Sequence, residues 1–172
     1  FLQVSGTPRK TFINNTPRLI AQESNDFITL PASAAQVYGP SLVFEQRYRN
    51  LGHWSSEKDR AEWRFQIPEG GRFDLWINWA LHRNAIGSSI SLKLGTTEIT
   101  GVVPDTGDWD TYNWAKLTTL SLPSGIHRLT AQSMRALRSN FLIDLRGLVL
   151  TPVDKGKFHP TASWQDVEVR PN

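Results

Sequence analysis

The feature of this sequence that most constrains its fold is an alternation of apolar and polar residues with a period of two. From Glu62 to Ile67 the order is Glu-Trp-Arg-Phe-Gln-Ile, which places three apolar side chains on one side of an extended segment. Residues 73–79 and 90–94 alternate in the same way. Because successive side chains of a β-strand point to opposite faces of a sheet, this period predicts half-buried strands.

Turn residues separate the alternating segments at spacings of about 8–12 residues, which is typical of a β-sandwich. We expect residues 62–67 and 73–79 to form an antiparallel hairpin through the turn at Glu69–Gly71. Residues 32–35 are either a short helical turn or a plain connection. The other predicted strands are residues 19–21 and 28–30, both at sheet edges, and residues 90–94, 98–103, 114–122, 126–133 and 141–151. The sequence therefore predicts an all-β sandwich.

The length and the two ends of the chain predict one domain with two arms. The chain has 172 residues, which is close to the size of one compact core. Both ends are polar and interrupted by proline, in contrast to the alternating middle. We therefore expect an N-terminal arm at residues 1–18, a β-sandwich at residues 19–152, and a C-terminal arm or linker at residues 153–172.

Composition excludes several classes of protein. The chain has no cysteine, so disulfide frameworks, thiolate metal sites and cysteine nucleophiles are ruled out. It has 19 Lys and Arg against 16 Asp and Glu, a net charge of +3 that is spread along the chain, whereas nucleic-acid modules usually concentrate basic charge. No apolar run approaches the roughly 20 residues that span a bilayer. We expect neither nucleic acid nor a membrane as a partner.

Sequence signatures of catalysis are missing as well. The four histidines have none of the spacings of zinc hydrolases, and neither a G-x-S-x-G elbow nor a glycine-rich phosphate loop occurs. Nothing marks a glycosidase pair among the carboxylates. We therefore expect that the chain is not an enzyme. The competing enzyme class is a small β-sandwich lyase or hydrolase, which would need a cleft with a His or Tyr beside a carboxylate.

The segment Asp105–Trp114 has the densest concentration of aromatic and polar side chains. It contains two Trp, one Tyr, three Asp and one Asn in ten residues between two predicted strands. Flat aromatic faces flanked by carboxylates and amides suit a sugar ring, whose C–H face packs on the aromatic ring while its hydroxyls form hydrogen bonds at the edge. In the alternative interpretation, Trp109 and Tyr112 attach the loop to the core, and Asp108 and Asp110 cap turns.

The position along each strand predicts different roles for the other tryptophans. Trp63 and Trp79 share the inward phase, so we expect them in the core. The aromatic segment Tyr48–Trp54 is interpreted as structural, because a Gly-x-Trp before a strand commonly places the indole under the end of a sandwich. Trp76 has the outward phase and lies either under a covering arm or exposed on a sheet face. Trp164 is expected to pin the C-terminal arm to the sheet.

A series of short motifs occurs in a definite order: Leu30-Pro31-Ala32, Ala35, Val37-Tyr38-Gly39, Phe44-Glu45, Asn50-Leu51-Gly52-His53-Trp54, Asp59, Trp63, Gly71-Arg72-Phe73, Ala80, Thr106-Gly107-Asp108-Trp109, Leu122 to His127, and Asp144 to Leu150. In this order they resemble the galactose-binding-domain-like modules related to family 6 and family 35 carbohydrate-binding modules, over roughly residues 28–152. Similar stretches accompany bacterial sulfatases and fucosidases. The resemblance implies a jelly-roll β-sandwich that binds glycans through loops at one end, without catalysis.

The resemblance also implies a set of ligand-binding residues. Trp109 matches the aromatic residue that such modules stack on sugar, and the loop His82–Gly87 lies beside the same rim. In the last strand the family often has an Asn two positions before the Asp, and here that position is Leu142. Because Arg forks suit sulfate or carboxylate groups, an anionic polysaccharide is a further hypothesis. The predicted ligand-binding residues are Trp109, Tyr112, Asp108, Arg83, Asn84, His82 and Arg138.

Many modules of this kind hold a structural calcium ion through acidic residues of the first and last strands. Asp144 matches the residue of the last strand, but the first-strand positions are Pro31 and Ser33, which are poor ligands. Glu23 or Glu45 could take their place, since calcium sites tolerate different arrangements of oxygen ligands. The resemblance therefore suggests a calcium site formed by Asp144 with Glu23 and Glu45.

These inferences combine into one functional hypothesis. We expect a non-catalytic carbohydrate-binding module that targets a covalently linked polysaccharide-degrading enzyme to its glycan. The resemblance further implies a secreted or cell-surface bacterial protein, either extracellular or periplasmic. The alternative is a structural or interaction sandwich, which packs its aromatic loops against a neighbouring catalytic domain and binds no sugar.

Overall fold

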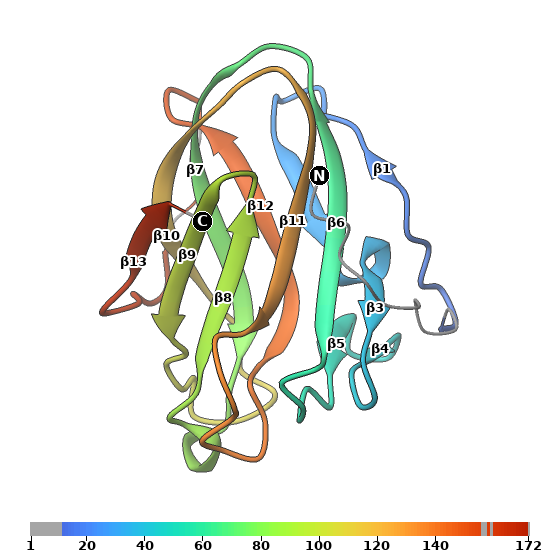
Figure 1. The fold of residues 1–172 in the computed structure, drawn as a ribbon, viewed down its shortest axis with the longest axis vertical. Helices are drawn as coiled ribbons and strands as arrows, with labels where there is room; N and C mark the ends of the chain where they lie inside the picture. The colour runs from blue at the N-terminus through green and yellow to red at the C-terminus, as the bar shows by residue number, and fades with distance from the viewer. Residues whose placement is uncertain (1–11, 156–157, 159, 172) are drawn as a thin grey trace.

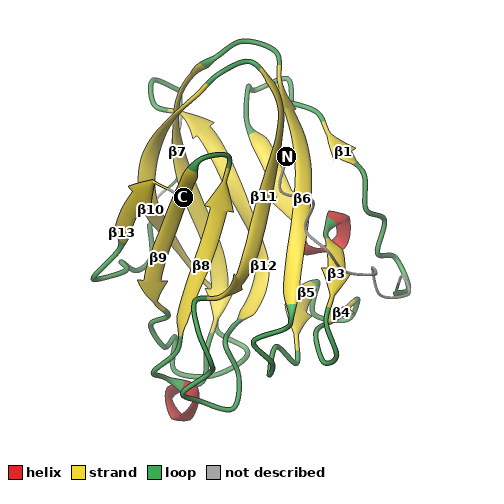
Figure 2. Cartoon of the chain, viewed as in Figure 1, coloured by secondary structure: helices red, strands yellow, loops and turns green. Residues whose placement is uncertain are grey.

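The computed structural model describes residues 12–155, 158 and 160–171, which form two packed β-sheets (Figures 1 and 2). The front sheet contains β1 (Leu19–Ile20), β3 (Gln36–Tyr38), β6 (Arg60–Ile67), β8 (Ser89–Leu94), β9 (Thr97–Val102), β11 (Gly125–Ser133) and β13 (Glu168–Pro171). The back sheet contains β2 (Ile28–Pro31), β4 (Val43–Glu45), β5 (Asn50–Gly52), β7 (Gly71–Ala80), β10 (Asn113–Leu122) and β12 (Asp144–Pro152). The predicted all-β sandwich is confirmed. Its helical turns are η1 (Ala32–Ala34) and η2 (Arg83–Ala85).

The predicted hairpin between residues 62–67 and 73–79 is wrong. Strand β6 pairs with β11, with Trp63 opposite Leu129, whereas β7 pairs with β10 and β12 in the other sheet. The chain thus crosses from the front sheet to the back sheet between Ile67 and Gly71. The alternation identifies the buried face of each strand correctly, but it does not identify the neighbouring strand. Both apolar faces meet in the same core from opposite sides.

The core between the sheets contains Trp63 and Trp79, as predicted, together with Trp54, which was predicted to lie under the end of the sandwich. Trp54, Trp63 and Trp79 are all fully buried. Each of these indole N–H groups donates a hydrogen bond to a backbone carbonyl, at N···O distances of 2.8 to 3.2 Å. A buried indole is stabilised by such a partner because its N–H would otherwise lose its hydrogen bond to water.

The C-terminal segment adds a strand to the front sheet. Strand β13 pairs with β9, with Val169 opposite Ile99. Before it, Trp164 is buried and packs edge-on against Trp79, with the ring centroids 5.3 Å apart. The prediction that Trp164 pins this segment to the sandwich is confirmed. Residues 1–11 of the predicted N-terminal arm lie outside the described residues.

The outer face of the back sheet has an aromatic cluster, which we call the sheet-face cluster: Phe27, Trp76, Trp114 and Phe158. The Phe158 ring lies 5.5 Å from Trp76, 4.9 Å from Trp114 and 5.6 Å from Phe27, measured between centroids. Trp76 is only 6% exposed, and its indole N–H donates to the Thr151 hydroxyl at 3.0 Å. Of the two alternatives for Trp76, the position under a covering segment is correct.

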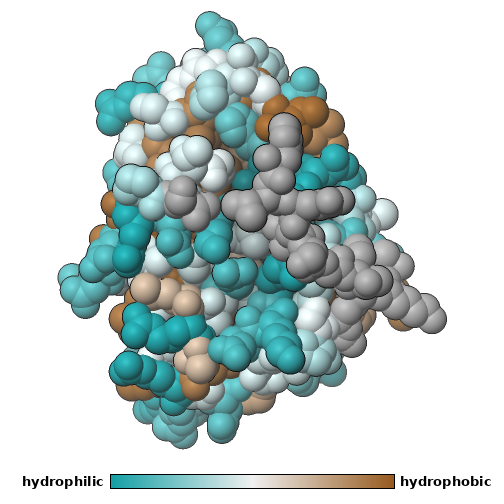
Figure 3. Space-filling view, in the orientation of Figure 1, coloured by the Kyte–Doolittle hydropathy of each residue, from teal (hydrophilic) through white to brown (hydrophobic). Residues whose placement is uncertain are grey.

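The opposite face of the molecule, toward the viewer in Figure 3, is mainly hydrophilic with small separate hydrophobic patches. Strands β6 and β11 place the exposed side chains of Arg64, Gln66 and Arg128 there. Within the described part of the chain, no helix has the length and apolar character needed to cross a membrane.

Candidate functional site

Several connections meet at the end of the sandwich where η2 lies, at the bottom of Figure 2. A buried carboxylate, that of Asp59, holds two of them together. It accepts hydrogen bonds at 2.9 to 3.2 Å from the backbone N–H groups of Ser41, Leu42, Ser55 and Ser56. Since charge-assisted hydrogen bonds are strong, Asp59 gives this end of the sandwich a rigid base.

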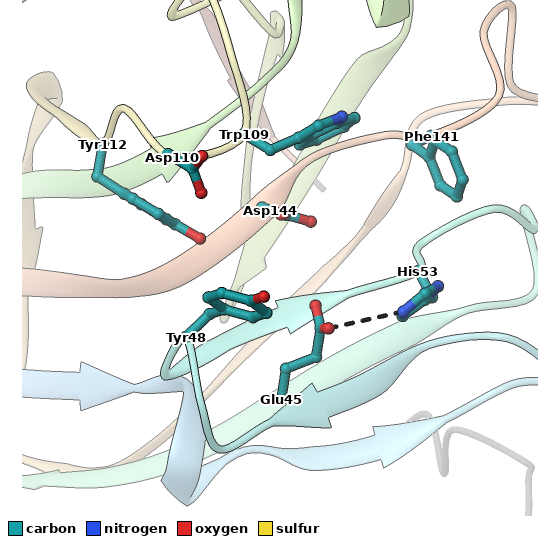
Figure 4. Close-up of a pocket in the computed structure, with 8 residues that line it drawn as sticks. All are labelled: Glu45, Tyr48, His53, Trp109, Asp110, Tyr112, Phe141 and Asp144. Atoms are coloured by element: carbon teal, nitrogen blue, oxygen red, sulfur yellow. Dashed lines mark ion pairs between the residues drawn. The ribbon is translucent and has the colours of Figure 1, made fainter.

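These connections enclose an open pocket of about 260 Å³ (Figure 4). Aromatic rings form half of its lining, and three carboxylates lie among them. One histidine also takes part, and no Lys or Arg is found among the described residues that line the pocket. The lining residues are Glu45, Tyr48, His53, Trp109, Asp110, Tyr112, Phe141 and Asp144.

The loop that carries Trp109 is shaped by its own polar side chains. Gly107 has a φ of +98°, a left-handed conformation that favours glycine. The Asp108 carboxylate accepts hydrogen bonds from the backbone N–H groups of Asp110 at 2.9 Å and Thr111 at 2.8 Å. Hydrogen bonds from the Thr111 side chain and from Asp110 lower the pKa of Asp108. Asp108 thus holds the loop and does not line the pocket.

Trp109 is held from two sides. Its ring packs edge-on against Phe141, with the centroids 5.8 Å apart and an angle of 89° between the planes. The His82 ring lies on another side, 6.3 Å away between centroids. The indole remains only half-buried. An aromatic ring that is fixed by neighbours and still accessible is suited to stacking on a ligand.

Arg146 on β12 holds the two tyrosines of the pocket. Its guanidinium carbon lies 3.6 Å from the centroid of the Tyr112 ring. Its Nε donates a hydrogen bond to the Tyr48 carbonyl at 3.1 Å. Burial, reinforced by the nearby Asp144 carboxylate, raises the pKa of Tyr112. The Tyr112 hydroxyl therefore stays protonated at neutral pH and is available as a hydrogen-bond donor.

Glu45 enters the pocket from the end of β4, across the neighbouring strand β5. A Cβ atom on Gly52 would lie only 2.0 Å from Glu45 Oε1, so this route requires glycine at position 52. The Asn50 side chain donates to Glu45 Oε1 at 3.3 Å, and His53 Nε2 lies 3.6 Å from Glu45 Oε2. These neighbours hold the Glu45 carboxylate toward the centre of the pocket (Figure 4).

Asp144 is the first residue of β12 and lies at the back of the pocket (Figure 4). Burial raises its pKa to about 7, and the negative charge of Glu45 adds to this effect. Within the described part of the chain, the side chains of Asp144 and Asp110 have neither a hydrogen bond nor an ion pair. The pocket therefore presents hydrogen-bond acceptors that none of the described residues uses.

The structure places the residues predicted to bind ligand in two groups. Trp109 and Tyr112 line the pocket. The others do not line it, and their contact with a ligand stays a prediction. His82 supports Trp109, and Arg83 donates to the Gly107 carbonyl at 3.3 Å.

The two remaining predicted residues, Asn84 and Arg138, do not line the pocket either. Asn84 is exposed on η2, and its backbone N–H donates to His82 Nδ1 at 3.1 Å. Arg138 is exposed on the connection before β12, and its backbone N–H donates to the Ser88 hydroxyl at 3.1 Å. Neither of the two predicted arginines, Arg83 and Arg138, lines the pocket.

The predicted calcium ligands are not brought together. Glu45 and Asp144 share the pocket, but Glu23 precedes β2, whose first residue, Ile28, pairs with Leu150 toward the other end of β12. No cluster of three or more His, Asp or Glu side chains that could hold a metal ion occurs in residues 12–155, 158 and 160–171. Because calcium takes six to eight oxygen ligands, these residues do not fit the expected site. Calcium binding itself stays a prediction.

The sequence interpretation missed part of the pocket. Segment Tyr48–Trp54 was interpreted as structural; Trp54 is fully buried, whereas Tyr48 and His53 line the pocket. His53 has a φ of 57°, a conformation uncommon for a residue other than glycine, and no sequence signal predicts it. Phe141 was included in a predicted strand, but it lies in the connection before β12. Leu142, at the position of the expected Asn, is fully buried.

Known structures share this fold. A family 35 carbohydrate-binding module from Clostridium thermocellum has a TM-score of 0.57 at 18% identity, covering 74% of this chain and 98% of the module. The C-terminal family 6 module of a marine laminarinase from Zobellia galactanivorans has a TM-score of 0.58 at 17% identity, covering 73% of this chain and 98% of the module. A family 35 module in complex with a disaccharide containing glucuronic acid has a TM-score of 0.58 at 16% identity, covering 83% of this chain and 96% of the module.

No protein-family model and no curated protein matches the sequence. The structural likeness therefore shows the fold, and it confirms the predicted resemblance to family 35 and family 6 modules over most of the chain. The chain resembles non-catalytic carbohydrate-binding modules in its architecture.

Proposed function

We propose that this chain is a non-catalytic carbohydrate-binding module and that its pocket holds a sugar unit of a polysaccharide. The observation that carries this proposal is the combination of accessible aromatic rings, led by Trp109, with the carboxylates of Asp110 and Asp144, which have no partner among the described residues. A sugar ring would stack its C–H face on the indole. Its hydroxyls would donate to Glu45 and Asp144 and accept from the Tyr112 hydroxyl.

The dimensions of the pocket indicate how much of a glycan it holds. At about 260 Å³, it is slightly smaller than the roughly 300 to 1,000 Å³ of sites for drug-sized ligands. One sugar unit at a chain end or branch fits this space better than a long stretch of polysaccharide. The next unit would then contact His82, Arg83, Asn84 and Arg138.

The biological role that we propose is targeting. One similar module is the C-terminal part of a laminarinase, which supports a role as an accessory to a covalently linked polysaccharide-degrading enzyme. We extend this to a secreted or cell-surface bacterial protein. In the alternative role, an interaction sandwich without sugar, the same aromatic rings would be covered by a neighbouring domain.

An anionic sugar is the second candidate ligand. The glucuronic acid disaccharide bound to one similar module favours it, and the exposed Arg83 and Arg138 could pair with its carboxylate. The charge of the pocket lining disfavours an anionic sugar, because three carboxylates and no Arg or Lys are found among its described residues.

The experiment that tests the proposal begins with affinity electrophoresis of the chain on neutral, amino and anionic polysaccharides. A ligand found there is titrated in a calorimeter against the wild-type protein and Trp109→Ala. Losing the stacking surface should weaken affinity about tenfold, equal to about 1.4 kcal/mol. The control variant is Ile126→Ala, which changes an exposed side chain on the front sheet. Unchanged affinity of a folded Trp109→Ala variant would overturn the proposal.

A further inference from the structure

The pocket has an uneven balance of charge. Glu45, Asp110 and Asp144 line it, and among the described lining residues only His53, 3.6 Å from Glu45, can carry positive charge. Arg146 lies over the Tyr112 ring and is not part of the lining. The described side chains therefore leave the pocket with uncompensated negative charge.

Aromatic rings surround these carboxylates. In Figure 4, Asp144 and Glu45 lie between the two tyrosines, Tyr48 and Tyr112, on one side and Trp109 with Phe141 on the other. The face of an aromatic ring attracts a cation within about 6 Å of its centroid. The aromatic rings and the carboxylates therefore both favour a positively charged group on the ligand.

The charge of a sugar should affect its affinity for this pocket. A neutral sugar could use the carboxylates as acceptors, but it would displace water and leave their charge without compensation, which is costly in a partly buried site. An anionic sugar would add repulsion.

We propose that the sugar unit bound in this pocket carries a protonated amino group, as in a glycan of glucosamine without N-acetyl groups. This inference rests on the proposed function, because it names the ligand class of the same site. An ammonium group has three N–H donors and no acceptor. The carboxylates of Glu45 and Asp144 accept from it, and the aromatic rings contact both the cation and the apolar face of the sugar.

The test compares oligosaccharides that differ only in the group at issue. The full chain is titrated calorimetrically with glucosamine oligomers and with N-acetylglucosamine oligomers of the same linkage and length, near pH 6.5. Glucose oligomers and uronic acid oligomers, each with calcium and with chelator, complete the set. Glucosamine oligomers should bind about tenfold more tightly than the N-acetylated ones, because acetylation removes the charge.

Variants connect this preference to the pocket. Glu45→Gln and Asp144→Asn keep the shape of the side chain and remove its charge. Each should weaken glucosamine binding about tenfold, so that most of the preference for glucosamine over N-acetylglucosamine oligomers is lost. The matched control is Glu57→Gln, an exposed carboxylate between β5 and β6 that does not line the pocket. Circular dichroism establishes that each variant is folded.

The possible outcomes separate the two proposals. If neutral or N-acetylated oligomers bind as tightly as glucosamine oligomers and depend on Trp109, the amino-sugar inference fails and the proposed function stands. If uronic acid oligomers bind best and only with calcium, the inference fails in favour of the anionic candidate. If no oligomer binds, or if binding does not depend on Trp109, both proposals fail.

Discussion

The sheet-face cluster and the pocket are built from the same kinds of side chain, but the described residues fill only the space over the sheet face. Over the back sheet, Phe158 lies against Trp76 and Trp114, and Trp76 is 6% exposed. In the pocket, Trp109 is held by Phe141 and stays half-buried beside an open space of about 260 Å³. A surplus of tryptophan is thus divided between packing and an accessible surface.

The polar groups beside the rings explain why the two regions differ. The Trp76 N–H has its partner in the Thr151 hydroxyl, so covering this ring leaves its polar atom satisfied. Beside Trp109, the carboxylate of Asp144 has no hydrogen bond from the described residues. Covering it with apolar chain would be costly. Unsatisfied polar atoms next to an accessible ring therefore indicate binding better than the ring alone.

The largest expected effect comes from Trp76→Ala. This change removes a large buried side chain and leaves the Thr151 hydroxyl without its partner. We expect the free energy of unfolding to fall by about 3 kcal/mol, measured by denaturant titration. Glycan affinity should stay within about twofold, because Trp76 is not part of the pocket lining. Loss of affinity without loss of stability would instead make the sheet face a binding surface.

The next largest effect is a pH dependence of the free energy of unfolding, which we expect from Asp144 in the pocket and not from the sheet-face cluster. Asp144 ionises near pH 7 in the folded protein and near pH 4 in an unfolded chain. Between these values the folded state keeps a proton that the unfolded state has lost. The stability from this group is therefore present below pH 4 and lost as the pH rises to about 7.

The variant Asp144→Asn should remove this loss. At pH 8 it should be more stable than wild type by on the order of 2 kcal/mol, and this advantage should shrink toward pH 4. Urea unfolding at several pH values measures the difference. Trp76→Ala serves as the contrast, because its loss of stability should be similar at all these pH values. The measured quantity is the difference in free energy of unfolding between Asp144→Asn and wild type. If this difference is the same at pH 8 as at pH 4, the Asp144 carboxylate is not destabilised by burial.

The sequence was sufficient for the fold class and for the burial of most strands. Alternation is a local property, so Trp63 and Trp79 could be assigned to the core from their phase alone. Pairing is not local. Strands β6 and β7 follow each other in the chain but lie in different sheets, and no residue near their connection determines which partner each takes.

The pocket could be predicted only where its residues are close in sequence. Trp109 and Tyr112 belong to one dense segment, and the resemblance to known modules also indicated Trp109 as a candidate contact with ligand. Glu45 and Asp144 were predicted as metal ligands, and the structure brings them together in the pocket. His53 and Tyr48 were missed because their role depends on a left-handed backbone at His53 and on the distant Arg146.

A smaller effect is expected at Arg146, which supports the pocket from outside. Arg146→Ala removes the guanidinium from the Tyr112 ring and the hydrogen bond to the Tyr48 carbonyl. We expect a loss of affinity of about fivefold, near 1 kcal/mol, because both tyrosines become less well positioned. Calorimetry measures it, and Arg128→Ala on the exposed front sheet is the matched control. Equal affinity in the two variants would show that Arg146 does not position the tyrosines.

The smallest effect is expected for Phe158→Ala. This variant tests the comparison between the sheet-face cluster and the pocket directly, because it uncovers the other rings of the cluster. Phe158 is itself partly exposed, so losing its ring contacts should lower the free energy of unfolding by less than about 1 kcal/mol. Trp76 and Trp114 should become more accessible, which acrylamide quenching of tryptophan fluorescence would detect. A binding site, on this argument, needs polar atoms without a partner beside its rings, and the sheet face lacks them at Trp76. The uncovered rings should therefore gain no glycan affinity. Glycan binding that persists in the double variant Phe158→Ala, Trp109→Ala, but not in Trp109→Ala alone, would show that Phe158 was covering a second site.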